Sequence, residues 1–232
     1  RAYNRGMKKR VVIRRLLAIG VSTMVAAVIL LTHAPTTQFT TYNNDLPVDG
    51  SAAEALDRLA VKGRAPKTGY ERSQFGDGWA VTYGCDTRQI ILYRDLTEVV
   101  MADDCRVASG VLRDPYTART ISYDKDDASR IQIDHVVALS DAWQKGAQLL
   151  TYEQRRQLAN DPLELLAVEG AANQQKGDAD AASWLPDNTA YRCEYVARQI
   201  AIKEKYDLWI TQGEYDAMKS VLSRCPDFPL PQ

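Results

Sequence analysis

The segments IQIDHVVAL at residues 131–139, NDPLELLAV at 160–168 and ANQQKGD at 172–178 decide the fold of this chain. In the first segment, β-branched residues flank Asp134 and His135, which predicts a strand. In the second, an Asp-Pro turn is followed by a short apolar strand. The third predicts the start of a helix, with Asn173 near its N-terminus. This order brings an acid, an imidazole and an amide together, which suits one divalent metal ion beside one general base.

Histidine is scarce in this chain, which contains only 2. His33 lies at the end of an apolar N-terminal segment, so His135 is the only histidine in the rest of the chain. Imidazole is the side chain that most readily gains or loses a proton near neutral pH. Any imidazole chemistry in the globular part must therefore use His135.

The net charge of −1 hides an asymmetry along the chain. Seven of the 29 basic residues lie among the first 15 positions, and no acid precedes Asp45. The rest of the chain therefore carries 22 basic against 30 acidic residues, a formal charge of −8. Proteins that bind nucleic acid over a wide surface usually have the opposite sign. Any contact with nucleic acid must therefore be local, at a groove with its own basic residues.

The basic N-terminus precedes an uncharged apolar run at residues 16–32. This pattern is typical of a secretory signal or a short membrane anchor. The run is slightly shorter than the ~20 residues that span a bilayer comfortably. The small residues around Ala34 resemble a cleavage site, whereas Pro35 argues against cleavage there, so both interpretations stay open. A buried core helix is the less favoured alternative.

Three regions follow from this pattern. We expect a basic N-terminus with a signal or anchor helix over residues 1–33, a polar linker over 34–47 and one globular domain over 48–232. The basic flank stays on the cytoplasmic side, so the domain is predicted to lie outside the cytoplasm whether or not the helix is cleaved.

The cysteines agree with export, because all four follow the apolar run. An even number of cysteines in an exported domain predicts two disulfides. Of the three pairings we favour Cys85 with Cys105 and Cys193 with Cys225, since each closes a local loop. A cysteine-based zinc site is the rival interpretation, and the lack of any Cys-x-x-Cys pair argues against it.

The remaining patterns predict an α+β fold in which a small site unit packs among helices. Residues 89–96 suit either a helix or a strand. Trp143, Trp184 and Tyr191 are expected in the core rather than as platforms for bases. Helices are expected near residues 48–61, 140–146, 152–158 and 190–206, with a last helix that begins at 211 or 212 and ends near 225. Strands are expected near 97–101, 107–112 and 120–123.

Asp134-His135 followed by Asn173, Lys176, Gly177 and Asp178 resembles the HNH, or ββα-metal, nuclease motif. From about residue 79 to 225 the chain resembles exported actinobacterial HNH proteins related to the C-terminal domain of GmrSD restriction endonucleases. Further matching segments are Gly84-Cys85-Asp86-Thr87-Arg88, Arg94-Asp95-Leu96, Asp114-Pro115-Tyr116, Ala142-Trp143, Asn160-Asp161-Pro162-Leu163, Trp184-Leu185-Pro186 and Tyr191-Arg192-Cys193. The ordered series is far more specific than an isolated Asp-His pair.

The resemblance implies metal-assisted hydrolysis of a phosphodiester. His135 would act as the general base on a water molecule. Asp134 and Asn173 would hold one divalent cation, and oxygen ligands favour Mg²⁺ or Mn²⁺. Lys176, one helical turn after Asn173, would contact phosphate. Arg88 is open to either a phosphate contact or an ion pair.

One position departs from the family pattern. Glu164 stands where the family usually has an asparagine that orients the catalytic imidazole. A glutamate there could accept a hydrogen bond from His135 and raise its basicity, hold an imidazolium, or add charge at the metal. Asn160 is a candidate substitute for the missing asparagine.

Each of these residues also has a purely structural interpretation. Asp134 and His135 could be a structural hydrogen-bonded pair, Asn173 an ordinary helix cap, and Lys176 a solvated surface lysine. Arg113 is undecided between phosphate and an ion pair, and Arg192 is expected to form a structural ion pair.

The sequence therefore predicts an exported or membrane-anchored, metal-dependent endonuclease that acts as a monomer. DNA is the expected substrate in preference to RNA, with little sequence specificity. The alternative is a catalytically weakened relative that binds a partner or nucleic acid at the envelope, an idea motivated by Glu164 and the acidic body.

Overall fold

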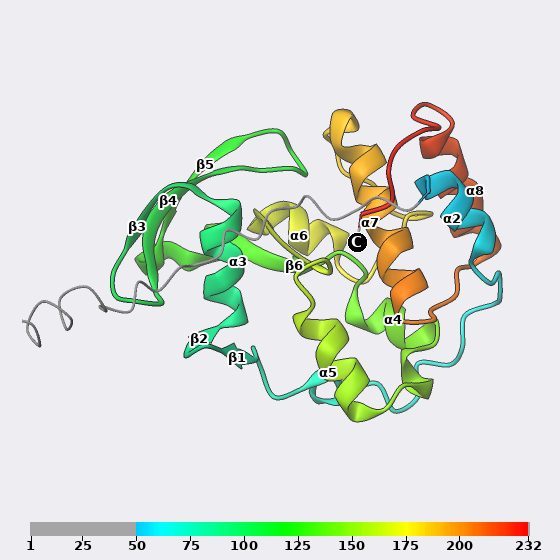
Figure 1. Cartoon of the computed structure of the whole chain (residues 1–232), viewed down its shortest axis with the longest axis horizontal. Coiled ribbons are helices and arrows are strands. Elements are labelled where there is room, and N and C mark those ends of the chain that lie inside the picture. Colours follow the sequence, from blue (N-terminus) through cyan, green and yellow to red (C-terminus); the bar gives the residue numbers. More distant parts are fainter. Residues whose placement is uncertain (1–49, 232) are drawn as a thin grey trace, which may run out of the picture. The chain divides into compact units, whose positions relative to one another are not determined.

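The computed structural model describes residues 50–231. The elements of this part are α2 (Ala52–Arg58), η1 (Arg72–Phe75), β1 (Val81–Thr82), β2 (Cys85–Asp86), α3 (Thr87–Asp95), β3 (Thr97–Met101), β4 (Val107–Arg113), β5 (Thr120–Asp124), η2 (Lys125–Arg130), β6 (Ile131–His135), α4 (Leu139–Gln144), η3 (Ala147–Leu149), α5 (Tyr152–Asn160), β7 (Leu165–Glu169), α6 (Gly170–Lys176), η4 (Thr189–Tyr191), α7 (Arg192–Lys205) and α8 (Gln212–Leu222). Figure 1 shows β3–β5 on one side of β6 and α6, and α2, α7 and α8 on the other. The predicted α+β class is confirmed.

The strands of the described residues form three small antiparallel sheets. These sheets are β1-β2, β3-β4-β5 and β6-β7. The ambiguous residues 89–96 belong mostly to a helix, because α3 ends at Asp95 and β3 begins at Thr97. Asp86 caps α3 by accepting a hydrogen bond from the Gln89 backbone N–H, which favours a helix at this point.

The site elements are an antiparallel hairpin followed by a helix. β6 pairs with β7 from Ile131 opposite Glu169 to His135 opposite Leu165. α6 begins at Gly170, directly after β7. The predicted order of strand, strand and helix is therefore confirmed. The prediction that residues 172–178 start the helix is wrong, because α6 ends at Lys176. The connection between the two strands contains α4, η3 and α5.

This hairpin lies between two hydrophobic cores, because successive side chains of a strand point to opposite faces. Ile133 packs into a core with α3, β4 and β5. Leu166 and Val168 pack into a second core with α2, α7 and α8. The same alternation directs Asp134 and His135 to opposite faces of the hairpin.

The tryptophans and Tyr191 that were expected in the core are found there. Trp143 is buried in a third core that includes Phe75 of η1. Trp184 packs edge-on against Tyr116, with ring centroids 5.0 Å apart. Trp184 and Tyr191 both pack against the core beside α7. None of these rings therefore needs a substrate to explain its position.

A buried cluster of charges joins α4, α7 and α8 to the chain after α6. Lys145 is fully buried, and its Nζ lies 2.7 Å from Asp180 Oδ2 and 2.6 Å from Glu214 Oε2. Three cations meet three carboxylates in this cluster, which makes it neutral. Its members are Arg64, Lys145 and Lys203 with Asp141, Asp180 and Glu214.

All four cysteines are oxidised. Cys85 is bonded to Cys105, and Cys193 to Cys225. The favoured pairing is therefore confirmed, and the cysteine-based zinc site is wrong. The first disulfide ties the β1–β2 hairpin to the loop between β3 and β4.

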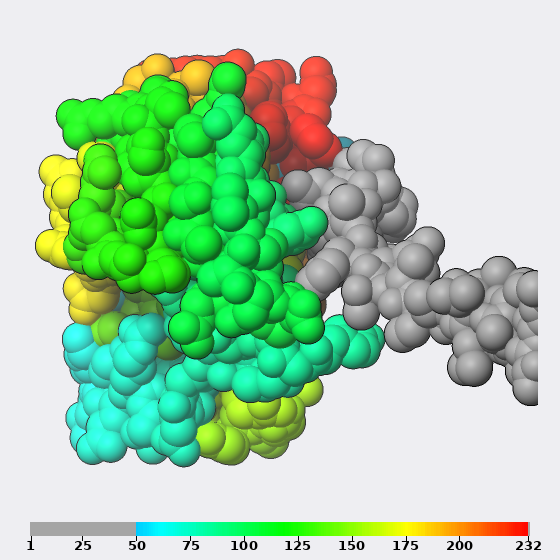
Figure 2. All heavy atoms as spheres, turned by 90° about the vertical axis from the view of Figure 1, so that its left-hand side faces the viewer, coloured from blue at the N-terminus to red at the C-terminus, as the bar shows by residue number. Residues whose placement is uncertain are grey.

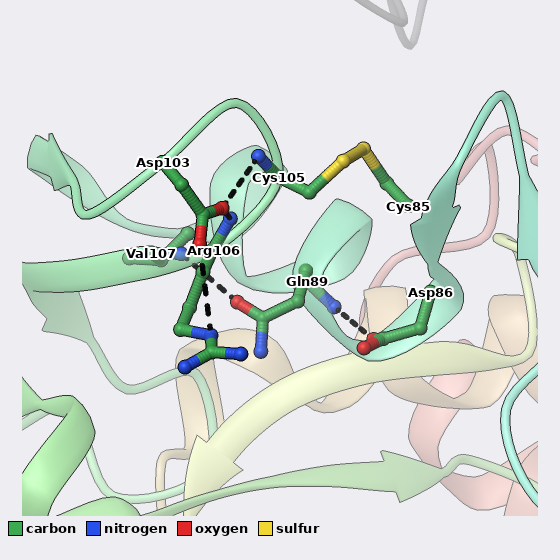
Figure 3. The surroundings of a disulfide bond; sticks show 7 residues. All are labelled: Cys85, Asp86, Gln89, Asp103, Cys105, Arg106 and Val107. Atoms are coloured by element: carbon green, nitrogen blue, oxygen red, sulfur yellow. Dashed lines mark hydrogen bonds and ion pairs between the residues drawn. A yellow bond between two sulfur atoms is a disulfide. The ribbon is translucent and has the colours of Figure 1, made fainter.

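Polar contacts reinforce that connection, as Figure 3 shows. Asp103 accepts a hydrogen bond from the Cys105 backbone N–H at 3.0 Å. Gln89 on α3 accepts one from the Val107 N–H at the start of β4, also at 3.0 Å. The start of α3 is thus fixed to the β3–β4 loop by one covalent bond and by a side-chain contact.

The export predictions fall mainly outside the described residues. The expected signal or anchor region (residues 1–33) and the linker (34–47) are not among residues 50–231. Within that range, no helix combines the length and the apolar character needed to cross a bilayer.

Candidate active site

A cleft of about 480 Å³ opens where β6 meets η1, α3, α4 and α6. η1 belongs to the segment between α2 and β1, which Figure 2 shows in cyan on the surface below the green strands. The polar part of the lining includes two arginines, a glutamine and three of the six predicted site residues. These residues are Arg72, Arg88, Gln132, Asp134, His135 and Asn173.

His135 is held in one defined state in this cleft. Its side chain is buried, and Nε2 lies 3.0 Å from the carbonyl oxygen of Ala159. Because a carbonyl can only accept, Nε2 carries the hydrogen and Nδ1 keeps its lone pair. Trp79 stacks on the ring with centroids 5.7 Å apart and planes within 6°. Burial lowers the pKa of His135 to about 3, so the imidazole is neutral at physiological pH.

Asp134 lies on the other face of the hairpin, and the fold supplies its partners. Lys176 Nζ is 2.9 Å from Asp134 Oδ1 and 2.8 Å from the carbonyl oxygen of His135. The Tyr116 hydroxyl donates to Asp134 Oδ2 at 2.5 Å. Burial raises the pKa of Asp134, and the Lys176 ammonium opposes that rise. The negative charge of Asp134 is thus balanced inside the protein.

Lys176 differs from both interpretations that the sequence suggested. Its side chain is fully buried, so the solvated surface lysine is wrong. Its ammonium group is also not placed to contact a phosphate, because Nζ donates to Asp134 and to the His135 carbonyl. The lysine instead joins the end of α6 to β6.

Asn173 lies within α6 and faces β6. Its Nδ2 donates to Gln132 Oε1 at 2.9 Å. Helix α6 begins at Gly170, with Glu169 at the N-cap, so the helix-cap interpretation of Asn173 is wrong. The Asn173 amide oxygen is left for another partner, because the amide nitrogen makes the contact with Gln132.

Glu164 and Asn160 do not contact the imidazole. Asn160 accepts from the Ala80 N–H at 2.8 Å, and its Nδ2 donates to the Arg156 carbonyl at 2.9 Å. Glu164 is fully buried and accepts from the Val137 N–H at 3.1 Å. The predicted orienting hydrogen bonds from these side chains are therefore not formed. The backbone carbonyl of Ala159, next to Asn160, orients the ring instead.

Glu164 is also unusual in its own right. Its Oε1 is buried without a hydrogen-bond partner among the residues that the structure describes. Burial raises the pKa of Glu164 well above its usual value, which favours the neutral carboxylic acid. A neutral glutamic acid is closer than a glutamate to the asparagine that the sequence resemblance implies at this position.

Two acids of the quoted segments brace β7. Asp95 accepts a hydrogen bond from the Ala167 N–H at 2.8 Å, and Asp114 accepts one from the Glu169 N–H at 2.9 Å. Arg94 supports the same strand by donating to the Leu165 carbonyl at 2.7 Å. These residues hold the scaffold of the site, which explains their place in the motif without a chemical step.

Sequence reasoning missed Arg72, and it left Arg88 undecided. Arg72 lies on η1, in a loop-like region without periodicity, so no sequence signal marked it. Its positive charge contributes to the lowered pKa of His135.

Arg88 Nη2 lies 3.3 Å from the Ile131 carbonyl oxygen. Arg192 donates to the Pro186 carbonyl at 2.7 Å, so the ion pair expected for it is wrong.

Comparison with known proteins identifies the family. Residues 88–221 match the model for the C-terminal domain of GmrSD restriction endonucleases. The chain belongs to this family. It is also 37% identical over 183 residues to an uncharacterised secreted protein of the fungus Arthroderma benhamiae, covering 78% of this chain and 88% of the relative. No solved structure matches the chain.

The region matched to the GmrSD C-terminal domain contains all the predicted site residues, while Arg72 and Trp79 lie before it. The family is therefore a domain of restriction endonucleases, which suggests a nuclease. The HNH type of its site and an actinobacterial origin stay predictions.

The residues around β6 fit a divalent cation only with help from a substrate. Asp134, Asn173 and Gln132 offer hard oxygen donors, which suit Mg²⁺ or Mn²⁺. Among residues 50–231, however, no three or more His, Cys, Asp or Glu side chains gather at one point to hold a metal. Mg²⁺ is commonly bound by one or two carboxylates together with substrate phosphates. Asp134 and Asn173 fit that pattern and stay predicted ligands.

Proposed function

We propose that this member of the GmrSD C-terminal domain family is an HNH-type, metal-dependent endonuclease that hydrolyses phosphodiester bonds of DNA, with RNA as a second substrate. The observation that supports this proposal best is the state of His135. It is a neutral imidazole with an unprotonated Nδ1, in a cleft that two arginines also line.

His135 would take a proton at Nδ1 from the water that attacks phosphorus. The Ala159 carbonyl fixes the tautomer, and the stacked Trp79 fixes the plane of the ring. Burial alone makes the imidazolium costly. An anionic phosphate beside the ring would offset that cost, because a nearby negative charge favours the protonated form. The base would therefore gain strength when the substrate is present.

Asp134 and Asn173 are the residues that would hold the cation. When bound, a divalent ion stabilises the charge that builds up on the phosphate and on the leaving oxygen. Lys176 keeps the Asp134 carboxylate in place beside β6. Gln132 keeps the Asn173 side chain turned toward the same strand.

We also propose that the protein acts outside the cytoplasm. The domain contains two disulfides, and such bonds persist in oxidising compartments. The fungal relative is named as a secreted protein. The basic and apolar N-terminal segment of this chain agrees with export.

Cleavage assays test the proposal. The oxidised chain is incubated with plasmid, single-stranded DNA and RNA in Mg²⁺, Mn²⁺ or chelator. We expect metal-dependent cutting that His135→Ala lowers by about 10²- to 10⁴-fold, the usual contribution of a general base. His33→Ala, which removes the other histidine, should cut normally.

Two results would change the conclusion. Undiminished cutting by His135→Ala would remove His135 as the base. If the wild-type chain cuts nothing with any metal, the alternative of a catalytically weakened protein that only binds is favoured. Glu164, and the hydrogen bonds of Lys176 and Tyr116 to the Asp134 carboxylate, already support that alternative. Glu164→Asn would then show whether that residue silences the site.

A further inference from the structure

The cleft differs in charge from the domain around it. Beyond the basic N-terminus the chain has 30 acidic against 22 basic residues. In the cleft, the carboxylates of Asp134 and Asp178 are each paired with a lysine. Arg72 and Arg88 are the cations of the lining itself, and no lining carboxylate is left unpaired to balance them. The cleft is therefore a positive site on an acidic domain.

Neither arginine is neutralised by a carboxylate of the part of the chain that the structure describes. Among residues 50–231, no carboxylate lies within ion-pair distance of the guanidinium of Arg72 or Arg88. Arg72 is exposed. Arg88 is half-buried, and its contact at 3.3 Å is with the neutral carbonyl of Ile131. A guanidinium without a carboxylate partner is well suited to bind a phosphate through two parallel hydrogen bonds.

The size of the cleft limits what can reach His135. That side chain is only 7% exposed, so a reacting phosphate has to enter the cleft. A volume of about 480 Å³ is that of a pocket for a small ligand. That volume suits a nucleotide or two of one strand and is small for a stretch of duplex.

We infer that Arg72 and Arg88 bind backbone phosphates from two walls of the cleft, and that the cleft takes an unpaired stretch of nucleic acid rather than an intact duplex. This inference rests on the proposed nuclease function, because it concerns the substrate of the same cleft. Long-range attraction cannot come from the acidic domain, so the two arginines carry the electrostatic part of binding.

The test measures binding apart from cleavage. The His135→Ala chain, in chelator, is titrated with a labelled oligonucleotide as a single strand and as a blunt duplex, at several salt concentrations. Adding Arg72→Ala or Arg88→Ala should weaken single-strand binding roughly tenfold each, as expected for the loss of a charged hydrogen bond. Each should also lower the slope of log affinity against log salt by about 0.7. Arg113→Ala, an exposed arginine outside the cleft, should change neither.

The outcomes separate this inference from the proposed function. The inference is overturned if the Arg72→Ala and Arg88→Ala chains bind the single strand with the same affinity as the Arg113→Ala chain. It is also overturned if the duplex binds as tightly as the single strand and its binding depends on the two arginines. Arginine-dependent binding of the single strand by a wild-type chain that cuts nothing would refute the nuclease and leave the inference standing. If Arg88→Ala lowers the melting temperature, Arg88→Lys, which keeps the charge, should retain binding.

Discussion

Glu164 shows at the scale of one residue how burial decides a charge. The carboxyl is fully buried, has one hydrogen bond to the Val137 N–H, and leaves Oε1 without a partner among the described residues. Its pKa in the folded protein is raised above the unfolded value by burial. The contribution of Glu164 to the free energy of unfolding is therefore largest below its unfolded pKa of about 4.3. This contribution decreases as the pH rises toward the pKa of Glu164 in the folded protein.

Glu164→Gln should consequently stabilise the protein at neutral pH. The amide keeps the shape of the acid without a proton that can be lost. We expect a gain of about 1 kcal/mol, or a melting temperature about 2–4 °C higher at pH 7, that shrinks toward pH 4.5. Thermal melts at the two pH values measure it, with Glu71→Gln on the surface as control. A loss of stability of equal size at both pH values would contradict a neutral Glu164.

Lys176 and Asp134 form a buried pair whose two members depend on each other. Lys176→Met should lower the free energy of unfolding by about 3–5 kcal/mol, because it leaves a buried carboxylate without its partner. The double variant with Asp134→Asn should recover much of that loss. Urea titrations measure these values.

A matched control for this prediction exists on the surface. Lys125 Nζ and Asp126 Oδ1 are 2.6 Å apart, but both side chains are exposed, so Lys125→Met should leave the free energy of unfolding almost unchanged. Equal effects of Lys176→Met and Lys125→Met would show that the Lys176 ammonium is not buried as described.

At the scale of elements, the turn from β7 into α6 has almost no free space. Gly170 starts α6, and a Cβ atom there would lie 2.3 Å from the Ser129 carbonyl oxygen. Because that neighbour is backbone, Gly170→Ala should destabilise the protein by at least about 2 kcal/mol. Gly63→Ala, where a Cβ atom meets nothing within 4 Å, should change stability by less than about 1 kcal/mol. Chemical denaturation of both variants checks this; similar values would mean that the turn relaxes.

The elements of the site were predictable, whereas its contacts were not. Local signals, namely β-branched residues around Asp134 and the Asp-Pro turn, predicted the hairpin correctly. The helix after it was predicted too, but its start was placed too late, because α6 begins at Gly170 and ends at Lys176. The cysteine pairing followed from short loops. The Ala159 carbonyl, by contrast, bonds His135 through the backbone, which has no residue signature. The burial of Lys176 and the position of Arg72 depend on how distant segments pack.

At the scale of the whole domain, the neutral cluster of buried charges predicts sensitivity to acid. Lys145 and Arg64 are among the cations that lower the pKa of Asp180 to about 2. A depressed pKa stabilises the fold above the unfolded value of about 3.9, and this contribution is lost as pH falls toward 2. We expect about 2 kcal/mol less stability at pH 2.5 than at pH 6 from this residue.

Asp180→Asn tests that assignment. The variant should be less stable at pH 6, because buried cations lose a partner, and its stability should fall less steeply between pH 6 and pH 2.5 than that of the wild type. Urea titrations at the two pH values measure the slopes. Parallel slopes would assign the acid sensitivity to other carboxylates.

The Cys85–Cys105 bond has a consequence for the timing of maturation. It anchors the start of α3, the helix that carries both Arg88 of the cleft and Arg94, which braces β7. In a reducing interior this anchor does not persist. The helix gains it only after the chain reaches an oxidising compartment. If the protein is the exported nuclease proposed above, this order of events would leave the scaffold of the cleft incompletely braced until the chain is separated from the genome of its own cell.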